Sequence, residues 1–156
     1  MLQHIHIKDL VIVCSLELEL ESGMTALTGE TGAGKSILVD ALELALGAKA
    51  DKGMIRAGCD RGEVNAVFQV NRHSQVQLWL TARELDAEDE CMVRRVLLNN
   101  GRSRAFINGS PVNIQTLKAL GELLVDIHGQ HEHQSLLKPA AQRELLDAYA
   151  GHTGLL

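Results

Sequence analysis

The sequence predicts an α/β fold in which antiparallel strands flank a strand–loop–helix unit. Three observations predict this class. Apolar and polar residues alternate over several short runs, as they do along strands with one buried face. A glycine-rich loop joins a short apolar run to an apolar run of helical length. Two Asn-Gly pairs lie between strand-like runs, and this pair is a strong signal for a tight hairpin.

The first residues predict two half-buried strands. Residues 3–8 place Ile5 and Ile7 on one side and polar residues on the other. Residues 15–21 alternate leucine with glutamate in the same way. A short apolar strand is then expected over residues 24–28, where it leads into the glycine-rich loop.

A buried helix is expected after the glycine-rich loop, from about Ser36 to Leu46, with Gly47 as its terminator. Residues 48–62 are expected to form a loop. Residues 63–70 carry apolar residues at alternate positions and predict another half-buried strand.

The remaining chain predicts helices and strands in this order: helix 74–87, strand 91–98, strand 102–107, helix 112–120, strand 123–129 and a last helix that begins near Pro139. Turns are expected at Asn99-Asn100-Gly101 and at Asn108-Gly109, because Asn and Gly tolerate a positive φ. The whole chain is therefore expected to be α/β with an antiparallel, β-rich flank.

Composition is that of an ordinary globular domain. Of the 156 residues, 46% are hydrophobic and 22% are charged. The formal net charge of −5 argues against a domain that coats nucleic acid with its whole surface, while a local basic patch stays compatible with it. The three cysteines, Cys14, Cys59 and Cys91, lack C-x-x-C spacing and predict neither a disulfide framework nor a zinc site.

The N-terminal residues lack the basic start and the uninterrupted apolar core of a signal peptide. No apolar run in the sequence is long enough to span a bilayer. We therefore expect a cytoplasmic protein without a membrane partner.

The stretch GETGAGKS, residues 29–36, fits the phosphate-binding pattern G-x-x-x-x-G-K-[ST] between a strand and a helix. Its glycines let backbone N–H groups turn inward around phosphates, and the N-terminus of the next helix adds its dipole. Lys35 is expected to reach the β- and γ-phosphates, and the Ser36 hydroxyl to ligate Mg²⁺. The predicted nucleotide-binding residues are Gly29, Glu30, Thr31, Gly32, Ala33, Gly34, Lys35 and Ser36.

Hydrolysis also requires an acidic Mg²⁺ partner and a group that orients the attacking water. Asp126 ends an apolar run and is one candidate, but a strand-end aspartate bonded to nearby backbone fits that position as well. Residues 128–134, HGQHEHQ, contain three histidines and two glutamines. Their pattern favours a polar loop beside the phosphates over a zinc site, and a glutamine there would reach Mg²⁺ and the attacking water.

Four arginines, Arg94, Arg95, Arg102 and Arg104, fall on the predicted hairpin with no acidic residue between them. They are candidates for contact with DNA phosphates, with the nucleotide or with a partner protein. A solvated strand face explains them equally well.

With these pieces in order, the chain resembles the N-terminal part of the RecN family of bacterial DNA repair ATPases, which belong with the SMC proteins and the wider ABC-type ATPases. The resemblance is carried by KDLVIV in the opening strand, by the phosphate loop, and by MIRAG at 54–58. GRSRAFING at 101–109 and IHGQHEHQ at 127–134 are the more specific motifs, and the resemblance extends to about Tyr149.

This resemblance implies the N-terminal lobe of an ATPase head, with residues 1–150 as the lobe and 151–156 as the start of the connection to a coiled coil. It implies ATP and Mg²⁺ as cofactors, with Gln130 as the catalytic and metal-binding glutamine and Gln134 as the weaker choice. The partners it implies are the C-terminal lobe of the same protein, a second head that joins on ATP binding, and DNA. It also implies a location at the nucleoid.

The chain departs from the pattern of a complete head. It has no LSGGE-like signature, no apolar-Asp-Glu strand, and no heptads after Tyr149. The expectation is therefore an ATP-binding half that needs the C-terminal lobe for hydrolysis. Two alternatives stay open: a self-contained small P-loop kinase that uses Asp126 and the hairpin arginines, and a module that mainly binds DNA or a partner.

Overall fold

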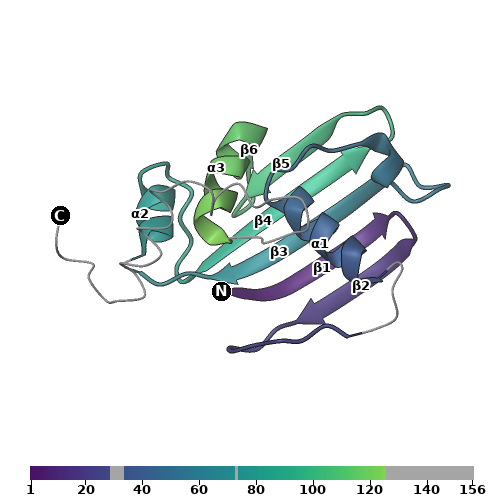
Figure 1. Ribbon diagram of the computed structural model, residues 1–156. Coiled ribbons are helices and arrows are strands. Elements are labelled where there is room, and N and C mark those ends of the chain that lie inside the picture. The colour runs from purple at the N-terminus through teal and green to yellow at the C-terminus, as the bar shows by residue number, and fades with distance from the viewer. Residues whose placement is uncertain (29–33, 73, 126–156) are drawn as a thin grey trace, which may run out of the picture. The chain divides into compact units, whose positions relative to one another are not determined.

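The computed structural model describes residues 1–28, 34–72 and 74–125 (Figure 1). The chain divides into two compact units, Met1–Leu124 and Val125–Leu156, and the elements described here belong to the first. In chain order they are β1 Leu2–Leu10, β2 Val13–Glu19, α1 Gly34–Ala45, the 3₁₀ helix η1 Lys52–Met54, β3 Arg61–Gln69, α2 Gln75–Thr81, β4 Glu90–Leu98, β5 Ser103–Ile107, β6 Ser110–Val112 and α3 Ile114–Leu124.

The described strands form one six-stranded sheet in the order β2-β1-β3-β4-β5-β6. Every neighbouring pair is antiparallel. The strands predicted at 3–8, 15–21, 63–70, 91–98 and 102–107 are confirmed as β1 to β5. The antiparallel, β-rich flank expected from the alternating runs is therefore the main body of this unit.

Register divides the sheet into two faces. Ile7 pairs with Val64, and Val64 pairs with Arg95, so these side chains share one face. We call it the covered face, because α1 packs against β1, β3 and β4 on this side, and α3 packs against β5 and α2 (Figure 1). The opposite face, which carries Glu63 and Arg94, is called the open face.

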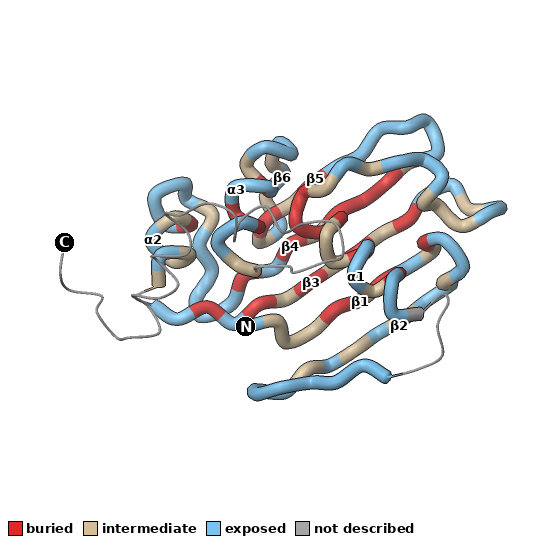
Figure 2. The backbone as a smooth tube through the Cα atoms, viewed as in Figure 1, coloured by how far each residue is buried: buried red, intermediate tan, exposed pale blue. Residues whose placement is uncertain are grey.

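The hydrophobic core lies between the covered face and the helices, where buried segments run along the central strands (Figure 2). Its largest fully buried side chains include Phe68 of β3, Leu44 of α1 and Leu117 of α3. Each such side chain contributes about 1.5–3 kcal/mol on burial. The core thus fixes α1, the helix that follows the phosphate loop, onto the middle of the sheet.

Two glycines let the backbone just after α1 approach the backbone of α3 closely. Gly47 follows α1 with a φ of 103°, as expected for the helix terminator. A Cβ at Gly47 would lie 2.8 Å from the Cα of Lys118. A Cβ at Gly121, inside α3, would lie 2.5 Å from the carbonyl oxygen of Leu46. No larger residue fits at Gly121 without moving one helix away from the other.

Both predicted turns are present. Asn108 and Gly109 have φ values of 47° and 82°, the two positive values that a type I′ hairpin turn requires. This turn adds the short strand β6, which the sequence did not predict, and Val112 belongs to β6 rather than to a helix. The helix starts at Ile114, where Asn113 Oδ1 accepts a hydrogen bond of 2.8 Å from the Thr116 amide.

The strand predicted at 24–28 is wrong for the structure as described. These residues have no strand pairing, and Met24 and Leu27 are 98% and 49% exposed. An isolated extended segment cannot form a ladder, and none of the described strands pairs with it. The apolar run predicted a strand, but a strand also requires a neighbouring strand for its hydrogen bonds, and the sequence pattern does not show whether one is present.

The strand predicted at 123–129 is also wrong where the structure describes it. Leu123 and Leu124 are the last turn of α3, because they continue the helical spacing of Leu117 and Leu120. A short apolar run does not distinguish a strand from a buried helix. Residues 126–129 lie outside the described residues, as does the helix predicted from Pro139.

The helix predicted at 74–87 is shorter than expected. α2 begins after Ser74, whose hydroxyl accepts a hydrogen bond from the Gln77 amide, and it ends at Thr81. Glu84 then adopts a φ of 57°, which a right-handed helix cannot include. The helix predicted from the periodicity was too long, because the spacing of apolar residues does not show that Glu84 adopts a left-handed conformation.

Candidate functional site

The first turn of α1 is the described part of the candidate nucleotide site. Lys35 and Ser36 lie in this turn, and both are exposed. Further along the same helix, Ile37, Ala41 and Leu44 are buried against the sheet. The apolar side of α1 is thereby held in the core while its N-terminus faces solvent.

The charge and hydrogen-bonding character of this turn fits a phosphate. The first amides of a helix have no intrahelical acceptor, and the helix dipole favours an anion at that end. No acidic residue occupies the first turn of α1, so no carboxylate within that turn opposes the approach of phosphate. A lysine for the phosphate oxygens and a hydroxyl for Mg²⁺ are both present in one turn.

Most of the other predicted site residues lie outside the described residues. Gly34 begins α1. The loop residues Gly29, Glu30, Thr31, Gly32 and Ala33, the candidates Asp126, Gln130 and Gln134, and the histidines of 128–134 all belong to the undescribed ranges. Within the described ranges, no cluster of three His, Cys, Asp or Glu residues is arranged to hold a metal ion. The roles of Lys35, Ser36 and Gln130 stay predictions.

The four hairpin arginines do not form a single surface. Strand alternation sends Arg94 and Arg104 to the open face and Arg95 to the covered face. Arg102 precedes β5 and is exposed, as is Arg104. Their grouping in the sequence therefore overstates how many are able to meet one partner.

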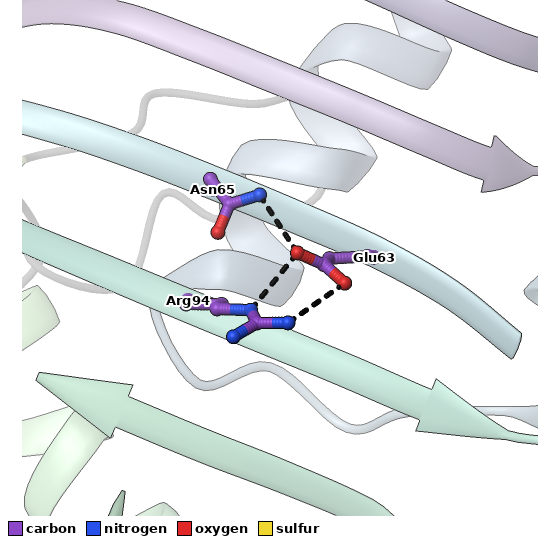
Figure 3. Close-up of polar contacts among 3 residues, drawn as sticks. All are labelled: Glu63, Asn65 and Arg94. Carbon is purple, nitrogen blue, oxygen red and sulfur yellow. Dashed lines mark hydrogen bonds and ion pairs between the residues drawn. The ribbon is translucent and has the colours of Figure 1, made fainter. Parts of the chain in front are cut away.

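Arg94 is held by an acid on the open face. Its Nε and Nη2 donate to the two carboxylate oxygens of Glu63 at 2.9 and 3.0 Å, and Asn65 donates to the same carboxylate at 3.0 Å (Figure 3). Burial alone would raise the pKa of Glu63, but the hydrogen bonds from Arg94 and Asn65 outweigh it and lower that pKa. The Arg94 guanidinium also lies 5.5 Å from the centre of the Phe106 ring.

Arg95 is enclosed under the helices. Only 3% of its surface is exposed, and its Nη2 donates to Ser103 Oγ at 2.9 Å. Burial lowers the pKa of this guanidinium. Because Arg94 is paired and Arg95 is buried, Arg102 and Arg104 are the two hairpin arginines at exposed positions.

Three connecting segments meet at one end of the sheet. The Val11 amide donates to the carbonyl of Met54 at 2.7 Å, which joins the β1–β2 turn to the loop that precedes β3. The Asn99 amide donates to the carbonyl of Asp60 at 3.0 Å, which adds the β4–β5 turn.

A shallow pocket of about 400 Å³ opens at this end, lined by Lys52, Arg56, Cys59 and Asn99 among others. Arg56 is the basic residue of the MIRAG motif, and the sequence did not predict that it lines one pocket together with Lys52. The glycines at 53 and 58 were the available signal that this loop folds back on itself.

Two of the three cysteines, Cys59 and Cys91, are poorly suited to thiol chemistry. Cys91 is fully buried in β4, and burial raises its pKa to about 12. The pKa of Cys59 is also raised, by desolvation and by a hydrogen bond to Asp9. Thiols with raised pKa values carry little thiolate at neutral pH and are poor nucleophiles.

None of the described helices has the length and apolar composition that crossing a membrane requires.

The chain matches a family model and is similar in sequence to RecN proteins. A family model described as an AAA domain (AAA_23) matches residues 4–149. The DNA repair protein RecN of Vibrio cholerae serotype O1 is 53% identical over 156 residues, which are 100% of this chain and 28% of that protein. RecN of Bacillus subtilis (strain 168) is 38% identical over 152 residues, which are 97% of this chain and 26% of that protein.

Solved structures show the same fold. A structure from work on ATP-driven dimerization and DNA-stimulated activation of SMC ATPases has a TM-score of 0.67 at 21% identity and covers 95% of this chain and 98% of that one. The SMC head domain from Thermotoga maritima has a TM-score of 0.58 at 24% identity, covering 76% of this chain and 41% of that one. The recombination mediator RecF with ATP has a TM-score of 0.57 at 17% identity, over 95% of this chain and 37% of that one.

These findings do not support the alternative of a self-contained P-loop kinase, since the relatives are DNA repair proteins and the structural neighbours are SMC heads and RecF. The fold predicted from the sequence, the N-terminal lobe of an SMC-like ATPase head, is confirmed. The chain belongs to the AAA domain family, and it is related along its whole length to RecN DNA repair proteins, spanning 28% of the Vibrio cholerae protein.

Proposed function

We propose that this chain is the ATP-binding lobe of an SMC-like DNA repair ATPase head. The observation that carries the proposal is the phosphate-binding sequence at the exposed N-terminus of a helix whose other side is anchored in the core. The family match over residues 4–149 and the RecN relatives support the same function.

Each residue of the phosphate loop has a role in this proposal. The backbone amides of residues 29–34 surround the phosphates, and Lys35 neutralises charge on the β- and γ-phosphates. Ser36 ligates Mg²⁺ through its hydroxyl. Gln130 completes the Mg²⁺ ligands and orients the attacking water, with Gln134 as the second choice. Bound Mg²⁺ would draw charge from the phosphates during transfer.

Hydrolysis in this proposal requires the C-terminal lobe and a second head. The chain spans about a quarter of the length of its RecN relatives, and it contains no apolar-Asp-Glu strand or LSGGE-like signature. The exposed segment 24–28 supports the need for another lobe, because its apolar residues lack a strand neighbour among the described residues. Residues 1–150 form the lobe, and 151–156 begin the connection to a coiled coil.

DNA contact is proposed through Arg102 and Arg104, the two exposed arginines of the hairpin. Cationic side chains on one exposed strand and turn suit a phosphate backbone, and the negative net charge of the whole chain restricts contact to such a local patch. From a DNA repair role we infer a location in the cytoplasm, at the nucleoid.

The experiment is Mg²⁺-dependent ATP hydrolysis by the purified chain, with and without a separately supplied C-terminal lobe. Turnover is expected only in the mixture, and Lys35→Ala should abolish it by weakening the hold on the β- and γ-phosphates. Lys49→Ala, an exposed lysine after α1, is the matched control and should leave turnover unchanged.

Substantial Lys35-dependent turnover by the chain alone would contradict the need for a second lobe. If Lys35→Ala binds nucleotide as well as Lys49→Ala does, the assignment of residues 29–36 as the phosphate loop is contradicted. Equilibrium binding of a fluorescent ATP analogue, measured on the same samples, separates these two results.

A further inference from the structure

Two rows of residues cross the open face at the end of the sheet where β3 begins. Strand register defines the first row as Lys8 of β1, Glu63 of β3, Val96 of β4 and Arg104 of β5. From β1 to β5 this row crosses three strand spacings, which is about 14 Å. Lys8 and Arg104 are exposed, so the row has a positive charge at each end.

The second row lies two residues further along the strands. Arg61 of β3 is opposite Leu98 of β4, whose amide donates to the carbonyl of Arg102 at 2.9 Å. Arg61 and Arg102 are exposed as well. The two rows thus bring together exposed cations from three strands and one turn. We call Lys8, Arg61, Arg102 and Arg104 the basic end of the open face.

The charges of the basic end are available to a ligand. Among the described residues, none of its four side chains forms an ion pair. Glu63 is the acid of the first row, and Arg94 donates to both of its carboxylate oxygens (Figure 3). Val96 is only 6% exposed, so it offers little apolar surface between the cations. A polyanion suits this surface better than an apolar partner does.

The opposite end of the same face is acidic. His4 Nε2 lies 2.8 Å from Glu17 Oε1, and Glu19 is opposite His4 in the strand register. Glu90, at the start of β4, adds a third exposed glutamate. His4 and Lys8 are four residues apart in β1, which is about 13 Å. This separation exceeds the Debye length of about 8 Å at physiological ionic strength, so the two ends act on a ligand separately.

We propose that the basic end of the open face binds the phosphate backbone of duplex DNA, with the duplex axis across the strands from β1 to β5. The inference rests on the DNA contact proposed above for Arg102 and Arg104. It extends that contact to Lys8 and Arg61, which lie outside the hairpin, on β1 and β3.

The shape of the basic end sets the direction of the duplex. Duplex DNA carries one negative charge per about 1.7 Å of its axis, so a length of about 14 Å presents about eight charges to the four cations. A duplex that followed the strands would bring its phosphates over the glutamates at the other end. Phe106, a half-buried aromatic residue of this face, has the Arg94 guanidinium 5.5 Å from its ring centre. Phosphate contacts therefore dominate over base stacking, and binding does not depend on DNA sequence.

The test measures binding of the 156-residue chain to a fluorescein-labelled duplex oligonucleotide, by fluorescence anisotropy between about 50 and 200 mM NaCl. Lys8→Gln with Arg61→Gln should reduce the log–log salt slope by about two, since each lost phosphate contact removes about 0.9. Lys49→Gln with Arg83→Gln removes the same charge from exposed positions elsewhere and should leave the slope unchanged.

A charge-preserving pair separates electrostatics from structure. Lys8→Arg with Arg61→Lys keeps both positive charges and should keep the salt slope of the unmodified chain. If this pair loses the same two units as the glutamine pair, the loss does not come from charge and the proposal is overturned.

Two further measurements test the direction of the duplex and the class of the ligand. Glu19→Gln with Glu90→Gln should leave DNA affinity unchanged, and a several-fold gain would show that phosphates reach the acidic end. Polyglutamate at equal total charge should compete weakly, because its charges are about 3.5 Å apart along an extended chain rather than about 1.7 Å. Competition equal to that of unlabelled duplex would assign the surface to an acidic protein and overturn the proposal.

The outcomes distinguish this inference from the proposed function. If the salt slope is unchanged in the Lys8 and Arg61 pair but falls in Arg102→Ala with Arg104→Ala, the inference is overturned and the hairpin contact stands. If the unmodified chain shows no salt-dependent DNA binding, both DNA proposals are overturned. The ATP-binding role is then still decided by the separate nucleotide measurements with Lys35→Ala.

Discussion

Arg94 and Arg95 are neighbours in β4, yet the two faces of the sheet treat them in opposite ways. On the open face, Arg94 donates two hydrogen bonds to the Glu63 carboxylate and lies near the Phe106 ring. On the covered face, Arg95 is more deeply buried and has one neutral partner. The comparison shows that strand alternation determines the surroundings of each charged side chain. Consecutive basic residues in a strand therefore lie on opposite faces of the sheet and do not form one basic surface.

The largest expected difference between the faces comes from apolar side chains. Phe68→Ala removes a fully buried ring from the covered face and should lower the free energy of unfolding by about 3–5 kcal/mol. Met92→Ala on the open face, where the side chain is 44% exposed, should change it by less than about 0.5 kcal/mol. Urea denaturation of both variants measures the difference. Similar losses would show that the open face is also covered.

Gly121→Ala tests how closely the covering helices approach. In an ordinary helix interior this change is stabilising by about 1 kcal/mol. Here the new Cβ meets the Leu46 carbonyl, so a loss of about 1–3 kcal/mol is expected. Ala119→Gly, at an exposed position of α3, is the control for helix propensity alone and should cost about 1 kcal/mol. A stabilised Gly121→Ala variant would refute the backbone contact.

Glu63→Gln tests the acid of the open face. The variant should lose about 1–2 kcal/mol at neutral pH, because it removes the charge from hydrogen bonds with Arg94. The pKa of Glu63 is lowered on folding, so its stabilisation is complete above the ordinary value of 4.5 and is lost as the pH falls through the folded value. The stability gap between the two proteins should therefore close below about pH 4.5.

Urea midpoints measured across this pH range give the check. Arg104→Gln, which changes the charge of an exposed residue of the same hairpin, should show a small gap that does not depend on pH in this way. A gap for Glu63→Gln that widens on acidification would contradict the sign of the pKa shift.

The smallest effect on stability is expected for Arg102→Ala and Arg104→Ala, each within about 0.5 kcal/mol. If these residues contact DNA phosphates, each substitution should reduce the salt dependence of DNA binding by about one unit of the log–log slope. Arg83→Ala, at an exposed position after the end of α2 and outside the hairpin, is the matched control. An unchanged slope in the double variant would remove the hairpin from the DNA interface.

Much of the sheet was predictable from the sequence because alternation and turn chemistry are local. The leucines of β2, the alternating apolar residues of β3 and the Asn108-Gly109 turn each determine their structure within a few residues. Segment 24–28 and residues 123–124 were not predictable in the same way. Their apolar runs fit a strand or a helix, and the available neighbours decide which one forms.

The candidate site was predictable only as a motif. The phosphate-binding pattern predicted that Lys35 and Ser36 lie at the start of a helix, and in the structure both lie in the first turn of α1. The split of the four arginines required register, because a one-residue offset along a strand exchanges the faces. The pairing of Arg94 with Glu63, 31 positions away, depended on which strand lies beside β4, and no local pattern contains that information.

The order of the strands also has a kinetic consequence. β4, β5 and β6 follow one another through short turns, so their contacts close small loops. β1 pairs with β3, whose partner residues Ile7 and Val64 are about 57 positions apart, and α1 with its phosphate loop lies inside that interval. Closing this long loop is the slow, entropically demanding step. We therefore expect the meander of β4, β5 and β6 to form early in folding, and the phosphate-loop helix to reach its final position only when β1 joins β3.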